Sequence, residues 1–251
     1  MNTNKKIAVI TGASRGIGKN VAVSLAASEY HVVLLARTEQ ALMEVKSEIT
    51  DNNGSASYFA VDVSRSSQIK ECIDCIIREY GHIDVLFNNA GILKHGTSDI
   101  LDKDLDELLQ INLHGAIYVA KHTAQYMKKQ RNGYIINLSS IGGKIAASFA
   151  GGYSASKFGL NGFSEALFKE MSAYDVKVST ICPAMVATDM VLNDRDFDAD
   201  LMIQPNDIVK TINYLLSLSK NAIPSELVIN CLSFTARETE ARKSVYNLKT
   251  N

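Results

Sequence analysis

The sequence predicts an α/β fold: one doubly wound domain with a mostly parallel seven-stranded sheet and helices on both faces. Short runs rich in β-branched residues alternate along the chain with longer runs of helical periodicity. Strands separated by helices pair in parallel through right-handed crossovers. Several runs, such as residues 8–10 and 32–35, are apolar throughout, as expected when helices cover both faces of a sheet.

The predicted elements follow one another in a regular order. Strands are expected at residues 7–10, 31–36, 56–61, 85–87, 134–138, 177–182 and 226–230. Helices are expected at residues 17–28, 39–52, 66–80, 102–130, 153–173 and 206–219. Because no repeat, low-complexity tract or Pro- and Gly-rich linker interrupts this order, residues 1–251 are expected to form a single domain.

Residues 187–204 break the alternation of strands and helices. They follow a strand, at the sheet edge where doubly wound folds bind ligands. The segment combines apolar residues with five aspartates, Asp189, Asp194, Asp196, Asp198 and Asp200. Its position favours a substrate lid, and the alternative is a solvated surface loop.

Composition narrows the class of partner. The 251 residues include 26 Lys and Arg against 27 Asp and Glu, a net charge of −1. This balance gives no electrostatic reason to expect nucleic acid or an anionic membrane as partner. No apolar run approaches the roughly 20 residues that span a bilayer. The N-terminus shows no signal-peptide core, so the expected location is cytoplasmic.

The cysteines and histidines do not suggest a metal site. Cys72 and Cys75 form a C-x-x-C motif, which is also found in redox pairs, but no second pair completes a zinc site. The motif lies in a helical stretch, so ordinary helix residues are favoured. The five histidines are scattered along the chain. We therefore expect no metal.

A glycine-rich loop joins the first strand to the first helix. Its sequence, Thr11 to Gly18, is T-G-A-S-R-G-I-G. Glycine permits the tight turn and lets the backbone approach a phosphate, while the helix N-terminus directs N–H groups at the anion. Between a strand and a helix, such a loop indicates a dinucleotide site. The expected cofactor contacts are Gly12, Ser14, Arg15, Gly16, Ile17 and Gly18.

The end of the second strand indicates which dinucleotide is bound. An NAD site places an acid there for the ribose 2′-hydroxyl, whereas a 2′-phosphate prefers arginine. Here the strand ends in Ala36-Arg37-Thr38, without an acid, and Arg15 lies in the glycine loop. Two arginines can form charge-assisted bonds to the phosphate. The sequence therefore favours NADP(H) over NAD(H).

Tyr153 and Lys157 are the main candidates for chemistry. Four residues apart on a helix, they lie on one face, one turn from each other. A lysine cation near a phenol is expected to lower the pKa of Tyr153 from about 10. Such a phenol can act as a general acid or base. Taken alone, this spacing is common on surface helices.

Together with the loop spacing G-x-x-x-G-x-G, these residues resemble the short-chain dehydrogenase/reductase family. The family places its catalytic serine thirteen residues before the tyrosine, which is Ser140 here, with Ser139 as a structural neighbour. Asn112 matches the asparagine that completes the family's tetrad; in relatives it bends a helix and holds a water near the lysine. The resemblance covers residues 6 to about 190.

Further motifs extend the resemblance to the cofactor. The family's NNAG element corresponds to residues 88–91, in which Asn89, Ala90 and Gly91 would line the cofactor. Asp62 and Val63 match the pair at the adenine end. Val186 and Thr188 match positions that contact the nicotinamide carboxamide. The family's Pro-Gly before them is Pro183-Ala184 here.

The resemblance implies a Rossmann-type oxidoreductase that transfers a hydride between nicotinamide and a small carbonyl or secondary alcohol substrate. Tyr153 would be the general acid/base, Ser140 would bind the substrate oxygen, and Lys157 would contact the nicotinamide ribose. Relatives associate through helices corresponding to residues 102–130 and 153–173, which implies a homodimer or homotetramer.

Three alternatives remain open. A 3-oxoacyl-acyl-carrier-protein reductase would need basic residues for its acidic carrier, which Lys128, Lys129 and Arg131 could supply, although Tyr174-Asp175 replaces a basic residue that such reductases often carry. A regulatory protein on the same fold is disfavoured by the intact tetrad. An epimerase or dehydratase of the extended branch is disfavoured because only about sixty residues follow Thr188.

Overall fold

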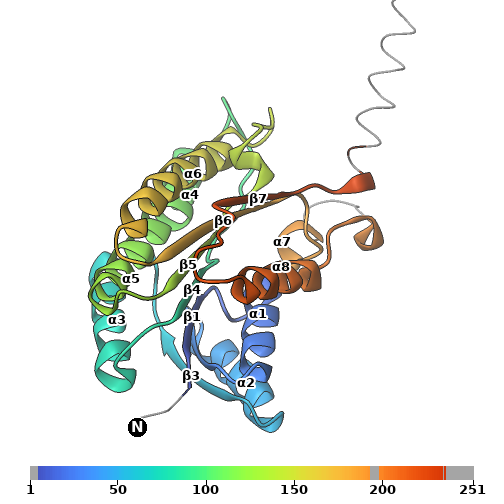
Figure 1. The fold of residues 1–251 in the computed structure, drawn as a ribbon. Coiled ribbons are helices and arrows are strands. Elements are labelled where there is room, and N and C mark those ends of the chain that lie inside the picture. Colours follow the sequence, from blue (N-terminus) through green and yellow to red (C-terminus); the bar gives the residue numbers. More distant parts are fainter. Residues whose placement is uncertain (1–4, 193–197, 234, 236–251) are drawn as a thin grey trace, which may run out of the picture.

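The computed structural model describes residues 5–192, 198–233 and 235, and its seven-stranded sheet confirms the predicted fold class (Figure 1). The strand order is β3-β2-β1-β4-β5-β6-β7, and every neighbouring pair is parallel. The strands are β1 Ile7–Thr11, β2 His31–Ala36, β3 Ser55–Ala60, β4 Val85–Asn88, β5 Tyr134–Leu138, β6 Lys177–Pro183 and β7 Glu226–Ile229. The order in which the chain adds strands to the sheet reverses at β1: β2 and β3 lie on one side of it, and β4 to β7 lie on the other. Such folds bind ligands at this point, between β1 and β4.

Helices cover both faces of the sheet (Figure 1). One layer consists of α1 Gly16–Ala27, α2 Glu39–Asp51 and α8 Pro205–Ser217, which pack in one apolar core with Ala8 and Ile10 of β1. The other layer consists of α3 Ser66–Tyr80, α5 Ala116–Gln130 and α6 Gly151–Ser172, which pack against Ile7 and Val9 of the same strand. Alternate residues of β1 thus contribute to opposite cores, which explains why the strand is apolar throughout.

The segment expected as one helix at residues 102–130 is helical throughout, as predicted, but it contains a π-helical stretch that the prediction did not include. It consists of α4 Asp102–Leu108, a π-helix η1 Leu109–Gly115 and α5. Hydrophobic periodicity marks which face of a segment is buried, but it does not reveal a single wider turn within a helix. Such π-turns are rare and occur frequently at functional sites. The π-helix carries Asn112.

The two ends of the segment at residues 187–204 lie side by side. Val186 forms an isolated bridge with Ile203, and the Ala187 N–H donates to the Ile203 carbonyl at 2.9 Å. Within the segment lie a short helix, α7 Asp189–Leu192, and a 3-10 turn, η3 Ala199–Leu201. Residues 193–197, with Asp194 and Asp196, lie outside the described residues, as do residues 236–251 of the polar C-terminal tail.

Candidate active site

A cavity of about 560 Å³ opens at the carboxyl edge of the sheet and gathers nearly all the predicted site residues. Ser140, Tyr153 and Lys157 line it together with the predicted cofactor residues Gly12, Ser14, Arg15, Gly16, Ile17, Arg37, Asp62, Val63, Asn89, Ala90, Gly91, Val186 and Thr188. Gly18 and Asn112 are not part of the lining. The volume is in the range typical of small-molecule and cofactor sites.

The glycine loop has no space for side chains at two positions. Gly12 has φ +64°, and a Cβ there would lie 2.8 Å from the Asn89 amide nitrogen. A Cβ on Gly18 would lie 2.3 Å from the Gly12 carbonyl oxygen. Glycine is therefore required at both positions for the loop to pack between the N-terminus of α1 and the loop after β4. This packing leaves the helix N-terminus open to an anion in the cavity.

Thr11, which the sequence did not single out, joins the glycine loop to the loop after β4. Its hydroxyl oxygen accepts hydrogen bonds from the backbone N–H groups of Asn89 and Ala90, each at 2.9 Å. In return, the Asn89 side-chain amide donates to the Thr11 carbonyl at 2.9 Å. A hydroxyl at the end of one strand can be assigned this role only when the neighbouring strand is known, so the pairing of β1 with β4 was needed to find it.

Asn88, the first residue of the NNAG element, connects the strand ends to the helix layer that contains α5 and α6. Its side-chain amide donates to the Ala116 carbonyl at 2.8 Å and to the Asn137 side-chain oxygen at 3.0 Å. Asn137 in turn donates to the Ser164 hydroxyl on α6 at 2.9 Å. These buried bonds set β4, β5 and α6 at fixed positions relative to one another, because buried polar groups that lose a partner are costly.

The outer end of the cavity carries two arginines, Arg15 and Arg37. Arg37 and Thr38 come directly after β2, and the first acidic residue after that strand is Glu39, at the start of α2. The Arg15 guanidinium lies 3.9 Å from the Asp189 carboxylate at the start of α7, with both side chains largely exposed. Asp62 accepts hydrogen bonds from the Ser64 N–H at 3.0 Å and the Ser64 hydroxyl at 2.8 Å, so its carboxylate is held within its own turn.

Lys157 is buried at the inner end of the cavity, with only 5% of its surface exposed. Its amino group donates to the Leu138 carbonyl at 3.1 Å and lies 5.8 Å from the centre of the Tyr153 ring. A Cβ placed on Gly91 would lie 3.8 Å from the Lys157 amine nitrogen and 3.3 Å from the Asn112 side-chain oxygen. The side chains of Lys157 and Asn112 therefore both approach the NNAG loop at Gly91. Burial lowers the pKa of Lys157 to about 8.

The expectation of a lowered Tyr153 pKa is wrong. Burial disfavours the phenolate and raises the pKa of Tyr153, while a hydrogen bond with Ser140 acts in the opposite direction. The Lys157 amine was expected to stabilise the phenolate. Since burial also destabilises the charged form of this amine, the lysine does not outweigh the desolvation of the phenol. Tyr153 is therefore protonated at neutral pH.

Asn112 lies directly beneath the cavity and is fully buried. The Asn112 side chain makes two hydrogen bonds with the backbone of Ile92. Its oxygen accepts from the Ile92 N–H at 2.8 Å, and its nitrogen donates to the Ile92 carbonyl at 2.9 Å. The nitrogen also lies 3.3 Å from the Ser156 hydroxyl, which donates to the Tyr153 carbonyl at 2.7 Å. The π-helix is thereby connected to both the NNAG loop and α6.

Ser140 follows β5 and caps a 3-10 turn, η2 Ile141–Gly143. Its hydroxyl oxygen accepts a hydrogen bond from the Gly142 N–H at 3.0 Å. A Cβ on Gly142 would lie 3.2 Å from the Tyr153 ring and 3.4 Å from this oxygen, so the serine and the tyrosine lie side by side. Ser139 is buried and donates to the Lys157 carbonyl at 3.4 Å.

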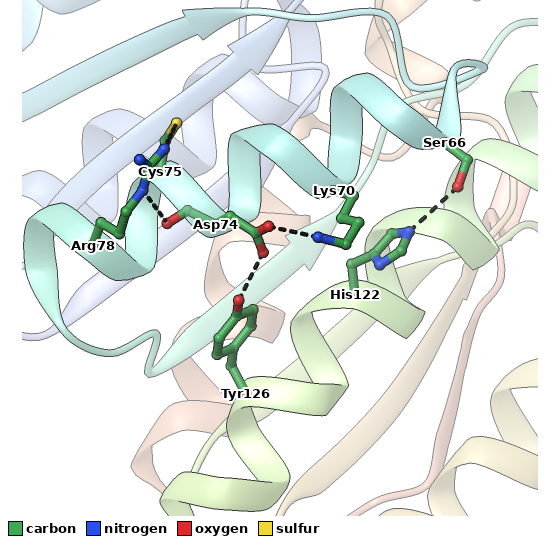
Figure 2. Close-up of polar contacts among 7 residues, drawn as sticks. All are labelled: Ser66, Lys70, Asp74, Cys75, Arg78, His122 and Tyr126. Carbon is green, nitrogen blue, oxygen red and sulfur yellow. Dashed lines mark hydrogen bonds and ion pairs between the residues drawn. The ribbon is translucent and has the colours of Figure 1, made fainter.

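Cys75 of the C-x-x-C motif belongs to a separate polar cluster on α3 and α5 (Figure 2), whereas Cys72 packs in the apolar core. The Arg78 guanidinium donates to the Cys75 sulfur at 2.8 Å, and Asp74 accepts from Lys70 and Tyr126, each at 2.7 Å. Cys72 is buried, which raises its pKa to about 12, so its thiol is not reactive as a thiolate. Both cysteines are free, and neither lines the cavity at the sheet edge.

The described part of the chain shows neither a metal-binding cluster nor a membrane-spanning helix. No group of three or more His, Cys, Asp or Glu side chains there is arranged to hold a metal ion. Among the described helices, none has the length and apolar character needed to cross a membrane.

Comparison with known proteins gives a consistent family. A family model described as short chain dehydrogenase matches residues 6–199. A fatty acyl-CoA reductase of Acinetobacter baylyi is 33% identical over 229 residues, which cover 90% of this chain and 78% of that protein. A 3-oxoacyl-(acyl-carrier-protein) reductase of Synechocystis is 33% identical over 225 residues, covering 84% of this chain and 88% of that protein.

A solved structure of a metagenomic short-chain oxidoreductase in complex with NADP has the same fold. Its TM-score is 0.80 at 31% identity, and the match covers 90% of this chain and 96% of that chain.

Replacing Thr11 by valine tests the junction between the two loops. Thr11→Val leaves the N–H groups of Asn89 and Ala90 without their acceptor, so the free energy of unfolding should fall by about 2–4 kcal/mol. Thr11→Ser keeps the hydroxyl and should stay within about 1 kcal/mol of wild type. Urea unfolding measures both variants. Equal stability of the valine and serine variants would contradict the proposed junction.

Proposed function

This chain belongs to the short chain dehydrogenase family and is an oxidoreductase, and we propose that it uses NADPH to reduce a small ketone or aldehyde. The observation that carries the proposal is the convergence of three groups in one cavity: the Tyr153 phenol, the Lys157 amine and the Ser140 hydroxyl. All three line the same cavity as the glycine loop.

The residues fit a phosphorylated dinucleotide. The glycine loop and the N-terminus of α1 would hold the pyrophosphate, and Arg15 and Arg37 would bind the 2′-phosphate through charge-assisted bonds. Asp62 and Val63 would lie at the adenine end. Asn89, Ala90, Gly91, Val186 and Thr188 line the route from there to Tyr153. When bound, the reduced nicotinamide supplies the hydride.

The protein's own residues would handle the substrate oxygen. Ser140 and Tyr153 present two hydroxyl groups side by side, and both can donate hydrogen bonds to a carbonyl oxygen. Such donors stabilise the negative charge that develops on the oxygen when the carbonyl is reduced. Because its pKa is raised, Tyr153 holds its proton at neutral pH and can deliver it to the forming alkoxide.

Lys157 would hold a positive charge behind the tyrosine. Its amine is protonated below about pH 8, and an ammonium there favours the phenolate left once Tyr153 has given up its proton. Asn112 would act through position, since it fixes the NNAG loop at Ile92 and the start of α6 through Ser156. The four residues thus have separate roles within one proton-transfer step.

A small free carbonyl compound is favoured over an acyl group on a carrier protein. Two of the three basic residues at the end of α5 are already paired with acids: Lys128 bonds Glu170, and Arg131 bonds Asp175 at 2.9 Å. An acidic partner would have to displace both acids. Two relatives are named as reductases of different substrates, one an acyl-CoA and the other an acyl-carrier-protein. Reduction of a carbonyl group is the chemistry that they share.

We further propose that residues 187–204 close over the substrate and that the chain assembles with copies of itself. Met190 and Val191 of α7 line the cavity together with Tyr153, which supports a lid at this position. On α6, Phe158 is 46% exposed, and the helices corresponding to α5 and α6 are where relatives associate, so a homodimer or homotetramer through these helices is expected.

The experiment that tests the proposed function is a panel of carbonyl compounds with NADPH. We expect NADPH to be consumed with simple ketones, diketones or acetoacetyl thioesters, and the Michaelis constant for NADPH to be lower than for NADH. An Arg37→Glu variant should lose that preference, because a carboxylate repels the 2′-phosphate. Absence of consumption across the panel, or equal use of both cofactors, would contradict the proposal.

Tyr153→Phe should abolish turnover without disturbing cofactor binding. Loss of a general acid costs about 10²- to 10⁴-fold in kcat, whereas the dissociation constant for NADPH should change less than about twofold because the ring remains. Tyr126→Phe is the matched control, since its hydroxyl bonds Asp74 on the outer face of α3. Wild-type turnover in Tyr153→Phe would refute the assignment.

The pH dependence of reduction should follow Lys157. Its pKa is lowered from 10.5 to about 8, so the ammonium is present below that pH and is lost as the pH rises through it. We expect kcat/KM for the carbonyl substrate to decline above about pH 8, since this parameter reports the free enzyme. A profile that stays level up to pH 10 would contradict this role of the amine.

A further inference from the structure

The turn that carries Ser140 is fixed on the backbone of α6. A Cβ on Gly143 would lie 2.8 Å from the carbonyl carbon and oxygen of Lys157 and 2.8 Å from the Asn161 amide nitrogen. Contact this close requires glycine at that position. The turn η2 therefore lies directly on the helix that also carries Tyr153 and Lys157.

Asn161 fixes this contact with one directed hydrogen bond. It lies one turn after Lys157 and two turns after Tyr153, on the same side of α6. Its side-chain amide donates to the Gly143 carbonyl at 2.8 Å, and a carbonyl can only accept, so the NH₂ group must face it. On the other side, the thiol of the buried Cys182 lies 3.8 Å from the Asn161 oxygen.

The bond from Asn161 begins a hydrogen-bond chain that ends on Ser140. The peptide group that contains the Gly143 carbonyl also contains the Lys144 N–H, which donates to the Ile141 carbonyl at 2.8 Å. The peptide group of that carbonyl contains the Gly142 N–H, which donates to the Ser140 hydroxyl oxygen at 3.0 Å. Every donor in the chain points toward the serine.

We propose that Asn161 is a positioning residue for Ser140, which it orients and polarises through the two peptide groups of η2. This inference rests on the proposed role of Ser140 in binding the substrate oxygen. A hydroxyl that accepts a hydrogen bond becomes a better donor, and successive bonds in one direction strengthen one another. With its oxygen occupied by the Gly142 N–H, the serine directs its hydrogen toward Tyr153 and the substrate.

The orientation matters more than the polarisation. Cooperative strengthening is of the order of 10–30% per bond, whereas a misplacement of about 1 Å near the reacting atoms costs up to 10²-fold in rate. Without Asn161, the Gly143 carbonyl loses its partner on α6, and η2 is held by its internal bonds and its packing on α6. We therefore expect an effect on kcat smaller than that of removing the Ser140 hydroxyl itself.

A double-mutant cycle between Asn161 and Ser140 tests the proposal. Asn161→Ala and the isosteric Asn161→Asp, which cannot donate to the Gly143 carbonyl, should each lower kcat for ketone reduction about 10-fold. The dissociation constant for NADPH should change less than twofold. In a Ser140→Ala background, measured by single turnover at high enzyme concentration, adding Asn161→Ala should cost less than twofold, because the residue acts through the serine.

The pH profile gives a readout that a merely structural role would not affect. The hydrogen bond with Ser140 acts to lower the pKa of Tyr153, against the effect of burial. If Asn161→Ala weakens this bond, the pKa of Tyr153 should increase. The pH at which the rate of alcohol oxidation increases should then move to a higher value in this variant. Thermal unfolding of each variant separates loss of fold from loss of positioning, and a folded Asn161→Asp suffices if the alanine variant is unstable.

The outcomes separate this inference from the proposed function. If Ser140→Ala keeps wild-type turnover, the assigned role of the serine fails. If Ser140→Ala loses turnover but Asn161→Ala and Asn161→Asp do not, only the positioning role is overturned. It is also overturned if the cost of Asn161→Ala is undiminished in the Ser140→Ala background.

Discussion

Burial of the Lys157 amine is the constraint on which the organisation of the site depends. A charged amine in the protein interior must be compensated by polar groups or lose its proton. Here the Leu138 carbonyl is its hydrogen-bond partner, and the lowered pKa shows that this bond compensates only part of the desolvation. The amine is therefore ready to interact with an anionic or hydroxyl-bearing group in the cavity, and Tyr153 is its neighbour one turn earlier on α6.

The strand ends around the lysine are held in place by hydrogen bonds between neighbouring strands and helices. Thr11 and Asn89 connect the loops after β1 and β4, and Asn88 and Asn137 connect β4 and β5 to the helices. The glycine loop and the catalytic candidates come from halves of the chain far apart in sequence. This network gives the cofactor side and the substrate side a shared framework, as catalysis requires when a rate depends on distances of a few tenths of an ångström.

The sequence predicted those parts of the molecule that depend on local patterns. Alternation of strands and helices gave the fold class, and the glycine loop and the spacing from Tyr153 to Lys157 placed residues that do line one cavity. It did not reveal the π-turn around Asn112, because the wider turn leaves the apolar pattern nearly unchanged. Thr11 and Asn161 were also not found, since each acts on a residue distant in the chain. The pKa of Tyr153 was predicted in the wrong direction because spacing shows a nearby cation but not how deeply both groups are buried.

A crystal structure with NADP⁺ tests the central claim most directly, since the account depends on one cavity serving both the dinucleotide and the three catalytic candidates. It predicts the 2′-phosphate between Arg15 and Arg37, the pyrophosphate at the N-terminus of α1, and the nicotinamide beside Tyr153, with the Lys157 amine on its ribose. A dinucleotide bound on another face, or a nicotinamide directed away from Ser140 and Tyr153, would contradict the account.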